Sequence, residues 1–168
     1  MLKNKTIILG IDPGIERLGI AIIEKNTLTI PKEKIVFSEC FKTLKSDPTE
    51  KRLFQIHQHI LEILEVYKPD IAIIEKIFFT VNQKTAITVA QARGSVMTAI
   101  GSKNIPIMEL TPTEIKESIT GNGSAKKQDI ARMLPKIIPI PNQTLQDDEL
   151  DAIASALAGS AKLRYSQL

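Results

Sequence analysis

Residues 7–14, Ile-Ile-Leu-Gly-Ile-Asp-Pro-Gly, decide the fold of this chain. The apolar run from Thr6 to Ile11 predicts a strand that is buried on both faces. The run ends on Asp12, and the Pro-Gly pair that follows is a strong turn signal. A carboxylate at the end of a buried strand needs a partner. That partner could be the turn itself, a lysine or a metal ion.

The order of the predicted elements after this strand indicates an α/β fold. Strands are expected at 18–24, 34–41, 71–75 and 105–110, and helices at 48–67, 82–102, from 111, at 128–137 and at 146–161. Three antiparallel strands followed by β-α-β crossovers give a mixed five-stranded sheet with helices on both faces. This is the architecture of a ribonuclease-H-like domain, and we expect residues 1–168 to form one such domain.

Composition limits the class of protein. The chain has 168 residues, 43% of them hydrophobic, which suits one compact domain. Its net charge of +3 permits a polyanionic partner but does not require one. The single cysteine, Cys40, excludes an intramolecular disulfide, and we expect it to be a small buried core residue. No signal peptide and no run of eighteen apolar residues is present, which predicts a cytoplasmic protein without a membrane span.

Glu75 is the second acidic residue at the end of an apolar strand. The segment Ile71–Glu75 has no polar face, and apolar residues resume at Ile77. A glutamate in this position needs a cation to stay charged. A salt bridge to a lysine such as Lys76 and a functional cation are both consistent with the sequence.

The last predicted helix opens with a cluster of acidic residues. Asp147 and Glu149 are explained as favourable negative charges in the first turn of a helix. Asp148 and Asp151 are three residues apart and share one helix face, which continues with apolar side chains. Two aspartates on a core-facing side repel each other unless a cation lies between them.

The predicted topology brings these acidic residues together. Asp12 and Glu75 would end neighbouring strands, and the last helix can place Asp148 and Asp151 over the same edge. Oxygen ligands without nearby cysteine or histidine favour Mg²⁺ or Mn²⁺ over zinc. Such a cluster serves two-metal phosphoryl transfer, in which one ion activates the attacking water and the other stabilises the leaving oxygen.

The sequence resembles the RuvC family of Holliday junction resolvases over nearly its whole length. The matching segments are ILGIDPG (8–14), IIEKIFF (73–79), NQKTAITVAQARG (82–94), PTEIKESITGNGSAKKQD (112–129) and DDELDAIASALA (147–158). The resemblance implies a metal-dependent endonuclease that resolves four-way DNA junctions during homologous recombination and repair. It further implies a homodimer that hydrolyses phosphodiesters in two opposing strands, and it suggests a branch-migration helicase complex as partner.

The resemblance also implies roles for individual residues. It assigns metal binding and catalysis to the four acidic residues, with two Mg²⁺ ions per site expected and Mn²⁺ able to substitute; these are Asp12, Glu75, Asp148 and Asp151. Lys116 and Lys127 take the positions of basic residues near the scissile phosphate. Phe78, with Phe79 beside it, matches an aromatic residue that stacks at the junction centre. Packing in the core is the alternative for both phenylalanines.

Small residues on the helix 82–102 suit a close contact between two subunits, although packing of this helix on the sheet explains them equally well. The sequence departs from the family pattern at Lys76, Ala90, Asp147 and Glu149, and none of these changes removes a catalytic group.

Three other functions fit parts of the sequence. The same acidic residues would serve a ribonuclease-H-like nuclease that acts on an RNA–DNA hybrid or on structured RNA. A junction-binding protein without catalysis is disfavoured, because DNA binding alone selects against four carboxylates. An actin-like ATPase is suggested by GIDPG alone, but it needs two such domains and a second phosphate loop.

Overall fold

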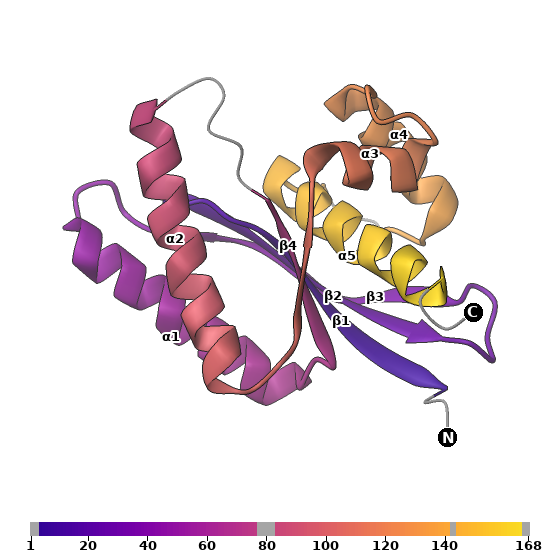
Figure 1. The fold of residues 1–168 in the computed structure, drawn as a ribbon, viewed down its shortest axis with the longest axis horizontal. Coiled ribbons are helices and arrows are strands. Elements are labelled where there is room, and N and C mark those ends of the chain that lie inside the picture. The colour runs from indigo at the N-terminus through magenta and orange to yellow at the C-terminus, as the bar shows by residue number, and fades with distance from the viewer. Residues whose placement is uncertain (1–3, 77–82, 142–143, 166–168) are drawn as a thin grey trace.

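The computed structural model describes residues 4–76, 83–141 and 144–165, which form one sheet between two layers of helices (Figure 1). The strands are β1 (Lys5–Asp12), β2 (Arg17–Asn26), β3 (Glu33–Lys42), β4 (Ile71–Glu75) and β5 (Ile107–Leu110). The helices are α1 (Thr49–Tyr67), α2 (Gln83–Ser102), α3 (Pro112–Thr120), α4 (Lys127–Ile137) and α5 (Asp147–Tyr165). Every predicted element is present, and most bounds differ by one or two residues. Within the described ranges, no helix is long and apolar enough to cross a membrane.

The sheet has the predicted mixed topology. Its strand order is β3-β2-β1-β4-β5, so the first strand lies at the centre. The first three strands are joined by tight connections and pair antiparallel. Strands β4 and β5 are each reached through a helix and pair parallel, β4 with β1 and β5 with β4. Consequently β1 and β4 end at the same edge of the sheet, as the sequence analysis predicted.

The two faces of the sheet have separate cores, because alternate side chains of each strand point to opposite sides. In β1, Leu9 and Ile11 belong to the core beneath α1 and α2, whereas Ile8 belongs to the core beneath α5. Helix α5 lies very close to the sheet at Gly10, where a Cβ atom would be 2.2 Å from the carbonyl oxygen of Ala152. Only glycine fits there, so the strand sequence determines how near the last helix lies.

Candidate active site

Two of the predicted acidic residues end neighbouring parallel strands. Asp12 is the last residue of β1 and Glu75 the last residue of β4. The register pairs Ile11 with Ile74, so the two acidic residues are the next positions along both strands. The carboxyl ends of parallel strands meet at one edge of a sheet, and this edge is where open α/β sheets bind ligands.

The first turns of α5 bring the other two acidic residues to this edge. The start of α5 lies directly over β2, since a Cβ atom on Gly19 would be 2.0 Å from the carbonyl oxygen of Asp148. Gly19 pairs with Asp12 across the β1–β2 ladder. The side chains of Asp148 and Asp151 are partly buried, 21% and 26% exposed. Both aspartates therefore lie over the end of β1, as their shared helix face predicted.

The carboxylates act on one another electrostatically. The pKa of Asp12 is raised to about 7, chiefly by burial and then by the charges of Asp151, Glu75 and Asp148, in that order, while Lys127 opposes the shift. Burial likewise raises the pKa of Glu75, with Asp151 adding to the shift and Lys116 and Lys127 opposing it. The site thus has more negative charge than its own lysines balance.

The four carboxylates of the sheet edge fit divalent cations in both chemistry and charge. Carboxylate oxygens are the ligands that Mg²⁺ and Mn²⁺ prefer, and the raised pKa of Asp12 indicates that its charged form lacks a sufficient counter-charge. Among the residues that the structure describes, no three acidic, histidine or cysteine side chains are close enough to bind one ion together. The carboxylates therefore surround the site without forming a closed cage.

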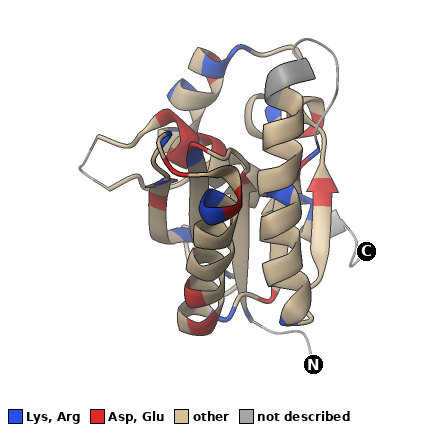
Figure 2. Cartoon of the chain, turned by 90° about the vertical axis from the view of Figure 1, so that its left-hand side faces the viewer, with Lys and Arg blue, Asp and Glu red and all other residues tan. Residues whose placement is uncertain are grey.

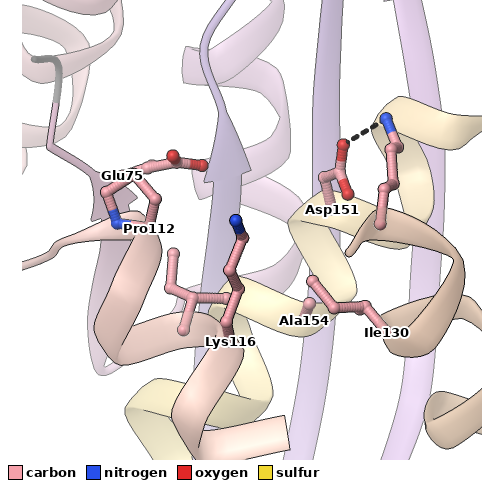
Figure 3. A pocket seen from close by; sticks show the side chains of 8 residues that line it. Glu75, Pro112, Lys116, Ile130, Asp151 and Ala154 are labelled. Carbon is pink, nitrogen blue, oxygen red and sulfur yellow. Dashed lines mark ion pairs between the residues drawn. The ribbon is translucent and has the colours of Figure 1, made fainter. Parts of the chain in front are cut away.

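Two lysines enter the same site from α3 and α4. A cavity of about 260 Å³ lies between these helices and α5, and Glu75, Lys116, Lys127 and Asp151 are among its lining residues. Figure 3 shows Glu75 and Asp151 on opposite sides of the cavity, with the ammonium group of Lys116 pointing into the space between them. Lys127 donates to Asp151 at 2.7 Å and lies 3.6 Å from Asp147. Both lysines therefore lie close to the acidic residues, and their role near the scissile phosphate stays a prediction.

A helix cap places Lys116. The Thr111 hydroxyl accepts from the backbone N–H of Glu114 at 3.1 Å, and the Glu114 carboxylate accepts from the backbone N–H of Thr111 at 2.8 Å. Lys162 of α5 pairs with the same glutamate at 2.6 Å, which ties α3 to α5. These contacts lower the pKa of Glu114 to about 2, with Lys162 as the largest cause. The beginning of α3 is thereby held in place relative to the acidic edge.

Arg17 also belongs to the site, although the sequence analysis assigned it no role. Its Nε donates to Oδ2 of Asp148 at 2.7 Å, its Nη2 forms an ion pair with the same oxygen, and Nη2 donates to Gln146 at 3.2 Å. The thiol of Cys40 lies 3.6 Å from this oxygen and is partly exposed. The expectation of a buried core cysteine is therefore wrong, because the end of β3 lies beside the start of α5 and is only partly covered by it.

Arg93 contacts the backbone at the sheet edge where Asp12 and Glu75 lie. It lies in the quoted segment QARG, but the sequence did not indicate its partners. Its Nε donates to the carbonyl oxygen of Glu75 at 3.4 Å, and its Nη2 pairs with Glu109 of β5. The cations that act on the Glu75 carboxylate are Lys116 and Lys127, which come from segments forty or more residues away.

Phe78 and Phe79, predicted to stack on DNA, lie outside the described residues.

The chain is similar to known proteins over nearly its whole length. The family model described as "Crossover junction endodeoxyribonuclease RuvC" matches residues 8–159. Among curated relatives, the protein of that name from Petrotoga mobilis is 38% identical over 152 residues, covering 89% of this chain and 90% of its own. The one from Brachyspira hyodysenteriae is 40% identical over 158 residues, covering 94% of this chain and 96% of its own.

Solved structures give the same result for the fold. The structure titled "T. thermophilus RuvC in complex with Holliday junction substrate" superposes with a TM-score of 0.87 at 28% identity and covers 96% of both chains. A yeast mitochondrial Holliday junction resolvase superposes with a TM-score of 0.69 at 12% identity, covering 95% of this chain and 82% of its own, and supports the fold alone. The predicted ribonuclease-H-like architecture, a mixed five-stranded sheet flanked by helices, is confirmed.

Proposed function

Since the chain belongs to the RuvC family of crossover junction endodeoxyribonucleases, we propose that its four acidic residues at the sheet edge cut phosphodiesters in four-way DNA junctions. The chain is a structure-selective, metal-dependent endonuclease of recombination and repair. The observation that carries the assignment of the residues is the position of Asp12 and Glu75 on adjacent strand ends, with Asp148 and Asp151 above them.

Each acidic side chain would bind the metal from a different direction. Asp12 is central, because the charges of all three other carboxylates raise its pKa, and the two aspartates of α5 approach it from above the sheet. We propose two Mg²⁺ ions per site, with Mn²⁺ able to substitute. When bound, such ions activate the attacking water and neutralise charge on the phosphate and the leaving oxygen.

Lys116 and Lys127 are proposed to act on the phosphate. Lys116 points into the cavity between Glu75 and Asp151, where an ammonium group can stabilise charge that develops in the transition state (Figure 3). Partial burial alone would lower the pKa of Lys127, but its hydrogen bond to Asp151 raises it. Lys127 therefore stays charged and can contact a phosphate as well as the aspartate.

The first test compares three substrates with and without divalent metal. We expect paired symmetrical nicks in an immobile four-way DNA junction with Mg²⁺ or Mn²⁺, no cutting of a matched linear duplex, and no cutting after EDTA is added. An RNA–DNA hybrid of the same sequence is the control for other ribonuclease-H-like nucleases. Cutting of the hybrid but not of the junction would contradict the proposed substrate.

A homodimer is proposed through the outer face of α2. Exposed residues recur along this helix at the spacing of one stripe, and none of them is charged: Ile87, Gln91, Gly94, Thr98 and Gly101. Figure 2 views α1 and α2 from outside and shows few charged residues along α2. The small residues Ala92 and Ala99 point inward and pack in the core, so they serve helix-on-sheet contact instead. For a branch-migration helicase partner, the family resemblance is the only support.

Gly94→Glu is expected to convert the dimer to monomers. Nothing lies within 4 Å of a Cβ atom at Gly94, so the substitution leaves the fold of one subunit unchanged. In a dimer through α2, the new carboxylate would be desolvated against the partner. Sedimentation equilibrium measures the mass, and Ser118→Glu on the exposed side of α3 is the control. A dimer that survives Gly94→Glu would place the interface elsewhere.

A further inference from the structure

We propose that Arg17 is a positioning residue for the metal site, which it serves by orienting the carboxylate of Asp148; this inference rests on the proposed function. Arg17 is the first residue of β2, five positions after Asp12, and reaches across to the start of α5. The two residues are 131 positions apart in the sequence. Their contact therefore joins the turn after β1 to the helix that supplies two of the four acidic residues.

The geometry of the contact indicates orientation. Nε and Nη2 of Arg17 both contact Oδ2 of Asp148, and the Cys40 thiol lies 3.6 Å from that same oxygen. Both of these nitrogens of the planar guanidinium converge on this one oxygen, so they hold Oδ2 in place more firmly than a lysine ammonium would. With Oδ2 bound by the protein, the carboxylate presents its other oxygen as a ligand. Hydrogen bonds to a ligating carboxylate of this kind orient it for the metal.

A second contact fixes the arginine itself. Nη2 donates to the side-chain oxygen of Gln146, one residue before α5, at 3.2 Å. The backbone N–H of Gln146 donates in turn to Glu149 at 2.8 Å, and Glu149 is buried and accepts from Ser38 at 3.2 Å. Arg17 thus belongs to a hydrogen-bonded network that includes β2, β3 and the first turn of α5. The buried glutamate that departs from the family pattern is one of its members.

Removing Arg17 changes metal affinity in opposite directions depending on whether Arg17 orients the Asp148 carboxylate or only neutralises its charge. If Arg17 only neutralised Asp148, removing it would leave a more negative site and strengthen cation binding. If Arg17 orients Asp148, removing it weakens cation binding, because Oδ2 is no longer held and the carboxylate can rotate away from the metal. The side chain of Arg17 is 46% exposed, so water and salt screen its charge, and we expect the loss of orientation to dominate.

The experiment measures binding of Mn²⁺ alone, without DNA, from the free Mn²⁺ signal in electron paramagnetic resonance. Arg17→Gln is expected to weaken Mn²⁺ binding about tenfold to a hundredfold, the usual range for such outer contacts. Arg17→Lys should fall between this variant and the wild type. In junction cutting, we expect Arg17→Gln to need more metal for half-maximal rate and to keep much of the rate at saturating metal. A purely structural role would not raise the metal concentration needed for half-maximal rate while leaving the rate at saturating metal largely unchanged.

The controls distinguish failure of this inference from failure of the proposed function. Arg132→Gln removes an arginine that pairs with Asp129 away from the acidic edge, and should bind Mn²⁺ like the wild type. Thermal unfolding in EDTA checks that Arg17→Gln is folded. If the wild type does not bind Mn²⁺, or Asp148→Asn binds it equally well, the proposed site is wrong. If both behave as expected and Arg17→Gln binds Mn²⁺ as tightly as the wild type or more tightly, only the inference about Arg17 is overturned.

Discussion

Asp12→Asn is expected to abolish junction cutting while junction binding survives or strengthens. Asparagine has nearly the same size but lacks the charge that binds the metal, so the rate should fall by about a thousandfold or more. Binding should persist, because a negative charge that repels DNA phosphates has been removed. The folded state should also tolerate the change, since burial and three carboxylates disfavour the charged form of Asp12. Cutting assays at saturating protein and a gel-shift titration in Ca²⁺ measure the two quantities separately.

The matched control is Asp147→Asn, in the first turn of α5. The Asp147 side chain is 74% exposed and lies 3.6 Å from the ammonium group of Lys127. Its replacement removes the same charge without touching the proposed ligands, and the cutting rate should stay within a few-fold of the wild type. Loss of junction binding together with cutting in Asp12→Asn would count against the assignment, as would cutting that survives.

Gly19→Ala is expected to impair both stability and cutting, although it adds only one methyl group. Its Cβ atom would lie 2.0 Å from the carbonyl oxygen of Asp148 and 3.1 Å from the Cβ atom of Asp12. Because backbone cannot give way as a flexible side chain can, α5 must shift at its first turn. We expect the free energy of unfolding to fall by about 1–3 kcal/mol, as in other overpacked sites. Displacing Asp148 by about 1 Å should slow cutting about a hundredfold.

Gly101→Ala is the control for the glycine substitution. Nothing lies within 4 Å of a Cβ atom at Gly101, which is in the last turn of α2. Alanine there should stabilise the helix by up to about 1 kcal/mol. Because Gly101 lies on the proposed dimer face of α2, it serves as a control for stability alone. Urea unfolding followed by circular dichroism measures the free energy of unfolding of both variants, Gly19→Ala and Gly101→Ala. Equal effects of the two substitutions would mean that α5 is not held against β2 as closely as the structure indicates.

The family and the fold were accessible from the sequence because their signals are local. Apolar runs, turn signals and helical spacing located the strands and helices, and the order of elements predicted a mixed sheet. The same order placed Asp12 beside Glu75, since two parallel strands joined by a crossover end at one edge. The spacing of Asp148 and Asp151 put them on one helix face. Four acidic residues therefore could be identified without any coordinates.

The partners of these acidic residues depended on the tertiary structure. Arg17 contacts Asp148 across 131 residues, and Lys127 contacts Asp151 from a different helix. Glycines at two positions allow α5 to lie against the sheet, and Cys40 lies partly exposed beside Asp148 at the start of this helix. Periodicity records which face of an element is buried, but it does not record which side chain of another element lies opposite. That pairing is decided by how closely the elements pack, so the acidic residues and the two lysines could be named from the sequence, whereas the pairing of Arg17 with Asp148 could not.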